Sequence, residues 1–117
     1  MKLAVVGSRS FKNYHQLKHV IDQICTEQFS ISEIISGGAK GADSLAERYV
    51  NDNQNIKLTV FHPDWTKHGR AAGVIRNTSI VKSCDILLAF WDGKSRGTKD
   101  SIAKAEQFGK KIILVMV

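Results

Sequence analysis

Five short runs of hydrophobic residues divide the chain into similar intervals. They occupy residues 3–6, 31–35, 58–61, 86–90 and 112–117. Most of these runs are continuous rather than alternating, and this pattern is typical of strands that are buried on both faces of a sheet. The runs therefore predict five strands at the centre of the fold.

Each interval between two runs holds hydrophobic residues at helical spacing. The positions that share one helical face are Leu17, Val20, Ile21 and Ile24; Leu45, Ala46, Tyr49 and Val50; Val74, Ile75, Thr78 and Val81; and Ile102, Ala103, Ala105, Glu106 and Phe108. Gly109 then ends the last helix, as a C-terminal glycine does. Because strands and helices alternate, we predict a single α/β domain over residues 1–117, with three layers (α/β/α), a five-stranded parallel sheet and four helices.

The unusual residues of the chain lie in the loops that follow the predicted strands. These loops are GSRSF (7–11), SGGAKGAD (36–43), HPDWTKHGRAAG (62–73) and WDGKSRGTKDS (91–101). The loops of the opposite edge, NDNQN (51–55) and FGKK (108–111), are ordinary turn sequences. In open α/β sheets, ligands bind beyond the carboxyl ends of the strands. The asymmetry therefore predicts a ligand site at that edge.

The loop SGGAKGAD has the features of a phosphate-binding turn. Gly37 and Gly38 lack Cβ, so their backbone N–H groups can approach an anion closely. The spacing Ser36-x-Gly38-x-x-Gly41 keeps the last two glycines of the dinucleotide-binding pattern G-x-G-x-x-G. Asp43 falls in the first turn of the next helix, where a carboxylate caps the helix or binds a ribose hydroxyl. We expect an anion on the Gly37 and Gly38 amides; the alternative is a glycine turn that serves tight packing alone.

The segment GKSRGT does not fit the P-loop pattern, because the position that requires glycine is occupied by Leu88. Gly97 and Thr98 instead open the fourth helix. Thr98 can cap this helix, and the free N–H groups of its first turn can hold an anion. Lys94 and Arg96 add positive charge. The alternative is a solvated turn with a simple cap.

Arginine and tryptophan side chains can complete a nucleotide site. Arg9 lies at the exit of the first strand, and Arg76 lies beside Asn77 in the third helix. An arginine can hold a phosphate through two parallel hydrogen bonds. Trp65 and Trp91 both follow strands, and an exposed indole ring stacks well on a base. The alternatives are surface ion pairs for the arginines and packing for the tryptophans.

The composition narrows the classes of partner. The chain has 17 Lys and Arg against 11 Asp and Glu, a formal net charge of +6. This charge favours anionic partners. The alternative is that it serves solubility alone. The basic residues are spread evenly along the chain, which does not favour a nucleic-acid-binding arm. Cys25 and Cys84 form no C-x-x-C pair, which predicts a reduced, cytoplasmic protein. Because the sequence shows no signal peptide, membrane span or metal motif, we expect no membrane and no metal partner.

Four segments, taken in order, resemble the SLOG superfamily, specifically its YspA-like members. They are GSRSF, SGGAKGAD, HPDWTKHGRAAGVIRN and AFWDGKSRGT. The resemblance implies a Rossmann-like domain that binds a nucleotide or a nucleotide-derived, ADP-ribose-like ligand at these loops. We expect no other cofactor. The resemblance also implies a homodimer or higher homo-oligomer, and C₂ dimers are the commonest oligomers. The candidate ligand-binding residues are Gly7, Ser8, Arg9, Ser36, Gly37, Gly38, Lys40, Gly41, Asp43, Asp64, Trp65, Arg76, Asn77, Trp91, Gly97 and Thr98.

Two relatives within this superfamily define the alternative functions. The Lonely Guy phosphoribohydrolases cleave an N-glycosidic bond with the glutamate of P-G-G-x-G-T-x-x-E and an arginine from a helix. Aligned on Gly97-Thr98, Ser101 stands at the glutamate, and Arg76 matches the arginine. Asp92 is the remaining candidate carboxylate, so Asp92 and Arg76 are the candidate catalytic residues, and we expect binding without efficient turnover. Kinship with DprA/Smf implies the second alternative, a DNA-binding accessory.

Overall fold

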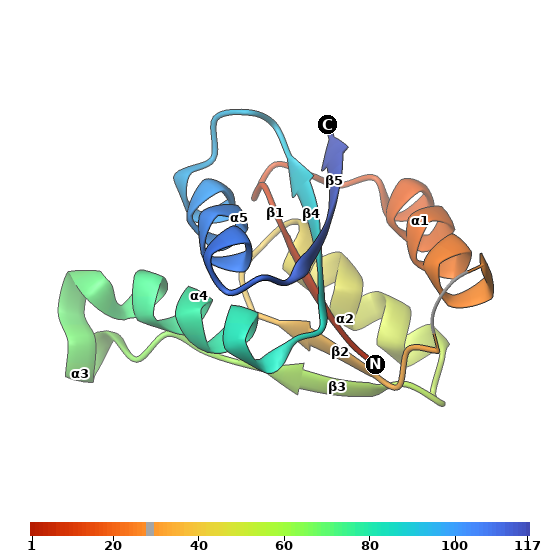
Figure 1. Ribbon diagram of the computed structural model, residues 1–117, viewed down its shortest axis with the longest axis horizontal. Coiled ribbons are helices and arrows are strands. Elements are labelled where there is room, and N and C mark those ends of the chain that lie inside the picture. Colours follow the sequence, from red (N-terminus) through yellow and green to blue (C-terminus); the bar gives the residue numbers. More distant parts are fainter. Residues whose placement is uncertain (28–29) are drawn as a thin grey trace.

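The computed structural model describes residues 1–27 and 30–117. Five strands form one parallel sheet in the order β3-β2-β1-β4-β5. The strands are β1 (Lys2–Gly7), β2 (Glu33–Ser36), β3 (Lys57–Val60), β4 (Ile86–Trp91) and β5 (Lys111–Met116). Helices cover both faces of this sheet, so the predicted Rossmann-like, three-layer α/β fold is confirmed (Figure 1).

Four helices of more than ten residues connect the strands, as the hydrophobic spacing predicts. They are α1 (Tyr14–Glu27), α2 (Ala42–Asp52), α4 (Ala72–Ser83) and α5 (Arg96–Gln107). A single helical turn, α3 (Trp65–His68), and a 3-10 turn, η1 (Gly69–Ala71), precede α4. The Asp64 carboxylate caps α3 by accepting a hydrogen bond from the Lys67 amide at 3.0 Å. The third strand is therefore followed by ordered helical turns rather than by an open loop.

The two faces of the sheet bury separate hydrophobic cores. Leu3 and Val5 pack with the apolar faces of α1 and α2. Ala4 and Val6, which point the opposite way, pack with residues of α4 and α5. Successive side chains of a strand alternate between the faces, so a strand covered on both sides must be hydrophobic at every position. This explains the continuous apolar runs of the sequence.

The buried face of α4 differs from the face that the sequence predicts. Val81 is buried as expected, but Val74 and Ile75 are 51% and 39% exposed. Asn77 is only 7% exposed and faces α5, where its side-chain amide donates to the Gly97 carbonyl oxygen at 3.3 Å. The same amide also donates to the Asp100 carboxylate at 3.1 Å. The prediction is wrong here because these two hydrogen bonds stabilise a buried polar side chain and turn its hydrophobic neighbours outward.

The two cysteines are free thiols, Cys25 half-buried and Cys84 buried. Burial raises the pKa of both thiols and so disfavours the reactive thiolate. Within residues 1–27 and 30–117, no helix has the length and apolar character that crossing a membrane requires.

The chain reverses its order across the sheet at β1. Strands β2 and β3 extend the sheet on one side of β1, and β4 and β5 extend it on the other. The loops that leave β1 and β4 therefore diverge, and they leave a crevice at the carboxyl ends of these two strands.

Candidate functional site

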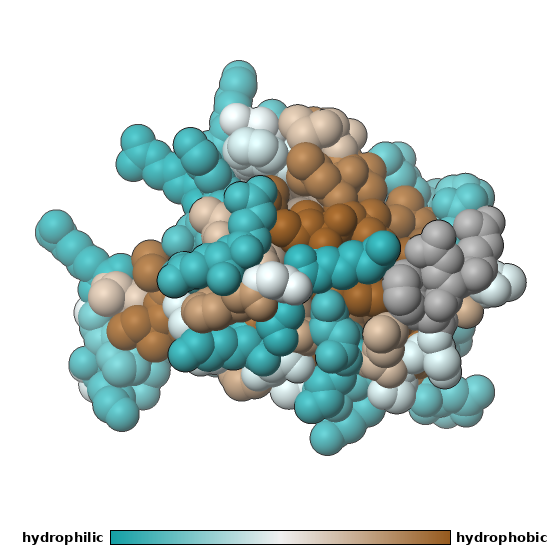
Figure 2. Space-filling view, in the orientation of Figure 1, coloured by the Kyte–Doolittle hydropathy of each residue, from teal (hydrophilic) through white to brown (hydrophobic). Residues whose placement is uncertain are grey.

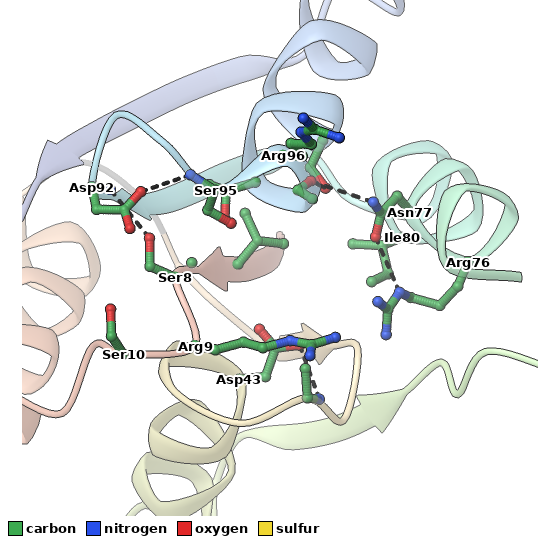
Figure 3. Close-up of a pocket in the computed structure, with 16 residues that line it drawn as sticks. Ser8, Arg9, Ser10, Asp43, Arg76, Asn77, Ile80, Asp92, Ser95 and Arg96 are labelled. Carbon is green, nitrogen blue, oxygen red and sulfur yellow. Dashed lines mark hydrogen bonds between the residues drawn. The ribbon is translucent and has the colours of Figure 1, made fainter. Parts of the chain in front are cut away.

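A cavity of about 470 Å³ occupies the crevice between the ends of β1 and β4 (Figure 3). Cavities of roughly 300–1,000 Å³ are typical of small-molecule sites. The walls come from the loop after β1, the loop after β4, the first turns of α2 and α5, and the middle of α4. The lining residues are Val6, Gly7, Ser8, Arg9, Ser10, Ala39, Asp43, Arg76, Asn77, Ile80, Asp92, Ser95, Arg96, Gly97, Thr98 and Ser101.

The loop after β1 is fixed against β4. The Ser8 amide donates to the Phe90 carbonyl oxygen at 2.9 Å, and the Ser8 hydroxyl oxygen accepts from the Asp92 amide at 3.1 Å. A Cβ on Gly7 would lie 2.7 Å from that carbonyl oxygen and 2.6 Å from the Cβ of Ala42, so this position requires glycine. The exposed Arg9 follows, and its side chain extends along the cavity wall beside Asp43 (Figure 3).

The loop after β2 binds the chain's own carboxylate. Asp43 is 6% exposed, and its Oδ2 accepts hydrogen bonds from the amides of Gly37 at 3.0 Å and Ala39 at 3.3 Å. The Gly38 amide donates to the Ser36 hydroxyl oxygen at 3.2 Å. Our expectation of a ligand anion on the Gly37 and Gly38 amides is therefore wrong, because the protein already supplies acceptors to these donors. Asp43 also forms no side-chain cap on α2.

The electrostatic environment of Asp43 follows from its burial. Burial raises the pKa of this carboxyl group, while the Ala39 amide, the positive charge of Arg76 and the Gly37 amide lower it in part. The net pKa lies above the ordinary value, because the loss of hydration outweighs these contacts.

The glycines of SGGAKGAD make room for neighbouring residues. A Cβ on Gly37 would lie 2.6 Å from Nη1 of Arg76, and one on Gly38 would lie 2.9 Å from the His62 ring. Gly41 has a φ of +80°, and a Cβ there would lie 2.3 Å from the Ser8 carbonyl oxygen. The packing alternative for this motif therefore describes the structure better than the phosphate-loop alternative.

Arg76 and Asn77 bridge the loop after β2 and the start of α5. Nη1 of Arg76 donates to the Gly37 carbonyl oxygen at 2.6 Å, and Nε donates to Oδ1 of Asn77 at 3.0 Å. The Asn77 amide nitrogen donates onward to the Gly97 carbonyl oxygen and, at 3.1 Å, to the Asp100 carboxylate. Burial lowers the pKa of Arg76, and the nearby Asp43 carboxylate opposes this effect. These contacts hold the guanidinium group in one position on the cavity wall.

The first turn of α5 lines the cavity. Asp92 holds the residues that precede this turn in place, because its Oδ1 accepts hydrogen bonds from the amides of Lys94 and Ser95, both at 2.8 Å. These two contacts, with Ser95 the stronger, lower the pKa of the Asp92 carboxyl group. Arg96, Gly97 and Thr98 line the cavity at this turn. The first amides of a helix have no acceptor within the helix and lie at the positive end of its dipole, so they favour an anion.

The structure gathers about half of the predicted site residues. The predicted residues that line the cavity are Gly7, Ser8, Arg9, Asp43, Arg76, Asn77, Asp92, Gly97 and Thr98. The predicted residues outside its lining are Ser36, Gly37, Gly38, Lys40, Gly41, Asp64, Trp65 and Trp91. Lining residues absent from the predicted set are Val6, Ser10, Ala39, Ile80, Ser95, Arg96 and Ser101.

The contacts of individual residues explain where the predicted site residues and the cavity lining differ. The indole N–H of Trp91 donates to the Ser95 carbonyl oxygen at 3.0 Å, which holds its ring against the loop. Trp65 lies on α3 and is 58% exposed. Ser95 could have been found from sequence, since Asp92-x-x-Ser95 is the pattern of an aspartate that binds the amides ahead of a helix. Within the described residues, no group of three or more His, Cys, Asp or Glu side chains is arranged to hold a metal ion.

The parallel sheet and the cavity at its switch point define a Rossmann-like α/β domain. A family model described as YspA, cpYpsA-related SLOG family matches residues 1–68, which is more than half of the chain. The protein belongs to this family, so the resemblance that the four loop sequences suggest is confirmed.

The chain is also similar to individual proteins. The chain is 30% identical to the Gene 61 protein of Mycobacterium phage D29 over 118 residues, which cover 96% of this chain and 94% of that protein. Among solved structures, it is similar to DNA processing protein A (DprA) from Streptococcus pneumoniae, with a TM-score of 0.77 and 19% identity. DprA from Helicobacter pylori, whose structure concerns single-stranded DNA binding, gives a TM-score of 0.73 and 18% identity.

The two DprA chains are longer than the region they share with this protein. Each likeness covers 97% of this chain, but 49% of the Streptococcus pneumoniae chain and 64% of the Helicobacter pylori chain. At this level of identity, the likeness shows a common fold.

Proposed function

We propose that this protein binds a nucleotide or nucleotide-derived ligand, such as an ADP-ribose-like molecule, in the cavity between β1 and β4. The observation that carries the proposal is that three arginines, Arg9, Arg76 and Arg96, line one cavity together with the first turn of α5. Guanidinium groups and the first amides of a helix are both strong donors for phosphate. A phosphate on α5 would therefore meet positive charge from two further walls.

The acidic residues of the cavity are compatible with an anion. Oδ2 of Asp43 is held by two loop amides, and Oδ1 of Asp92 is held by two others. Each carboxylate thus has a backbone partner for one oxygen and a second oxygen with acceptor capacity. A ribose hydroxyl is the matching donor in a nucleotide, and Asp43 lines the cavity.

Ligand binding is expected to depend on Arg9. The test is a thermal-shift screen with AMP, cyclic nucleotides and ADP-ribose, in which a ligand at ~100 times its Kd stabilises the fold by ~2.7 kcal/mol. Arg9→Ala should weaken a bound nucleotide roughly 10–100-fold, because a hydrogen bond to a charged group contributes ~1.5–3 kcal/mol. Arg70→Ala is the matched control, since Arg70 is exposed on η1 and lies outside the cavity lining. Equal affinity in the two variants would contradict the proposal.

Binding without efficient hydrolysis is expected of this site. The three aspartates near it, Asp43, Asp92 and Asp100, all have partners; Asp100 accepts from Asn77 and forms an ion pair with Lys104 at 2.8 Å. Ser101, at the position of the Lonely Guy glutamate, donates its hydroxyl to the Gly97 carbonyl oxygen. Incubation with AMP and cytokinin-type monophosphates, followed by chromatography, should show no free base. Release of free base at about 1 s⁻¹ or faster would contradict this expectation. If Asp92→Asn abolished that release, the protein would be an enzyme.

Single-stranded DNA binding is the second candidate function. The net charge of +6 and the likeness to Helicobacter pylori DprA favour it. Salt distinguishes the two candidates, because a protein that neutralises several DNA phosphates loses affinity steeply as salt rises. A mononucleotide in the cavity contacts few phosphates and should respond much less. Fluorescence titration of an oligonucleotide and of AMP at several salt concentrations separates them.

Self-association through β5 is expected. β5 is at one edge of the sheet, and within the described residues no strand pairs with its outer side. Leu114 and Met116 are 46% and 57% exposed, and a hydrophobic area lies over β5 between α5 and α1 (Figure 2). A long hydrophobic edge favours pairing with another strand, and a second copy supplies one across a two-fold axis. Light scattering should show a dimer of the unaltered protein, and Leu114→Lys should dissociate this dimer. A monomer of 13.0 kDa for the unaltered protein at tens of micromolar would contradict this expectation.

A further inference from the structure

A second, smaller cavity of about 150 Å³ lies between the loop after β3 and the side of α4. Its walls include Phe61, His62, His68, Ala72 and Ser79. Arg76 lines both this cavity and the larger one. The two cavities are therefore neighbours that share one guanidinium-bearing side chain.

The smaller cavity has room for only part of a small-molecule ligand. At about 150 Å³ it lies below the range of roughly 300–1,000 Å³ that complete small-molecule sites occupy, whereas the larger cavity falls within that range. Nη1 and Nε of Arg76 are held by Gly37 and Asn77, so the shared side chain stays in place between the two spaces. A ligand long enough to lie on both sides of Arg76 would contact both cavities.

The chemistry of the smaller cavity suits a flat heterocycle. Phe61, His62 and His68 are among its lining residues, and Ala72 adds an apolar surface. Aromatic rings stack on nucleobases, and a few polar groups such as the Ser79 hydroxyl orient them. Asp64 also lines this cavity, and its negative charge disfavours a phosphate here. The larger cavity, with its arginines and helix terminus, therefore takes the phosphate, and the smaller one takes the ring.

The glycine pair of the loop after β2 packs closely against two residues that line the smaller cavity. The space that a Cβ on Gly37 would fill is occupied by Arg76, and the space beside Gly38 is occupied by the His62 ring. Both of these neighbours line the smaller cavity. Gly37 and Gly38 thus allow the wall of this cavity to form close to the backbone of the loop.

We propose that the smaller cavity is a nucleobase subsite of the nucleotide site. The inference rests on the proposed function and deepens it: the ligand is a nucleoside phosphate whose base crosses Arg76 to lie among Phe61, His62 and His68. An anion without a base, such as ribose 5-phosphate, then uses the larger cavity alone.

A pair of adjacent substitutions on α4 tests the subsite. Ser79→Leu fills the smaller cavity, because Ser79 is one of its walls and is absent from the lining of the larger one. Thr78→Leu is the matched control, since Thr78 is also half-buried on α4 but lines neither cavity. His68→Ala removes one ring without adding volume, and it provides a second variant if Ser79→Leu does not fold. Circular dichroism verifies the fold of each variant.

Calorimetric titration with AMP and ribose 5-phosphate gives the readout. The unaltered protein should bind AMP at least about tenfold more tightly than ribose 5-phosphate, as expected of one stacked base. Ser79→Leu and His68→Ala should weaken AMP binding towards the affinity of ribose 5-phosphate. The affinity for ribose 5-phosphate itself should change by no more than about twofold. Thr78→Leu should leave the affinities for both ligands unchanged.

The other outcomes separate the subsite from the proposed function. The subsite is overturned if Ser79→Leu and His68→Ala leave AMP binding unaffected. It is also overturned if the unaltered protein binds AMP no more tightly than ribose 5-phosphate. Ribose 5-phosphate binding that requires Arg9 still supports the phosphate site in that case. Equal weakening of both ligands by Ser79→Leu also overturns the subsite, and failure of the unaltered protein to bind either ligand overturns both proposals.

Discussion

Gly41→Ala should destabilise the fold by about 3 kcal/mol or more. Gly41 has φ and ψ of 80° and −130°, a region that side-chain-bearing residues rarely adopt. A Cβ there would lie 2.3 Å from the carbonyl oxygen of Ser8 and 2.8 Å from the Cα of Arg9. Both neighbours are backbone atoms of the loop after β1, so the clash cannot be relieved by rotating a side chain. The loop that carries Arg9 into the cavity would have to move.

Gly109→Ala isolates the conformational part of this effect. Gly109 also has a positive φ, 67°, but a Cβ there would have no neighbour within 4 Å. Its substitution should cost only the left-handed backbone strain, about 1–2 kcal/mol. Urea denaturation of both variants gives the comparison. A free energy of unfolding equal in the two would show that α2 does not pack against the loop after β1 as described.

The second large effect concerns Asp43, where two substitutions should diverge. Asp43→Ala removes the acceptor of the Gly37 and Ala39 amides and should destabilise the fold by about 2–4 kcal/mol, because each buried donor left without a partner costs ~1–3 kcal/mol. Asp43→Asn retains one oxygen for both donors and should unfold close to the unaltered protein. It should also bind anions about tenfold more tightly, since a buried negative charge beside Arg76 is lost.

The pH dependence of anion binding follows from the same residue. Burial raises the pKa of Asp43, and a bound anion further favours its protonated form. Binding therefore takes up a proton, and affinity rises as pH falls from neutrality through that pKa. Sulfate is a suitable probe, because its own charge is constant over this interval. The rise should be smaller in Asp43→Asn than in the unaltered protein, and identical pH profiles would contradict the assignment.

The alternation of strands and helices could be predicted from the chain because it has a local cause. The runs at 3–6 and 86–90 are hydrophobic at every position, since each faces a core on both sides of the sheet. The concentration of glycine, arginine and serine after the strands also indicated the edge of the sheet at which the cavity lies. Arg9 and Thr98 were predicted from these segments and Arg76 from its place beside Asn77 in a helix, and all three line the cavity.

The roles of individual groups depended on contacts between distant segments. The sequence alone determined that a parallel sheet presents its polar, glycine-containing loops at one edge, because periodicity and turn chemistry act over a few residues. Only the tertiary structure decided that Asp43 occupies the amides of Gly37 and Ala39, and that Asn77 rather than Val74 is buried on α4. The physical reason is that a buried polar atom must find its partner in three dimensions, and the partners of Asn77 lie 20 and 23 residues away along the chain.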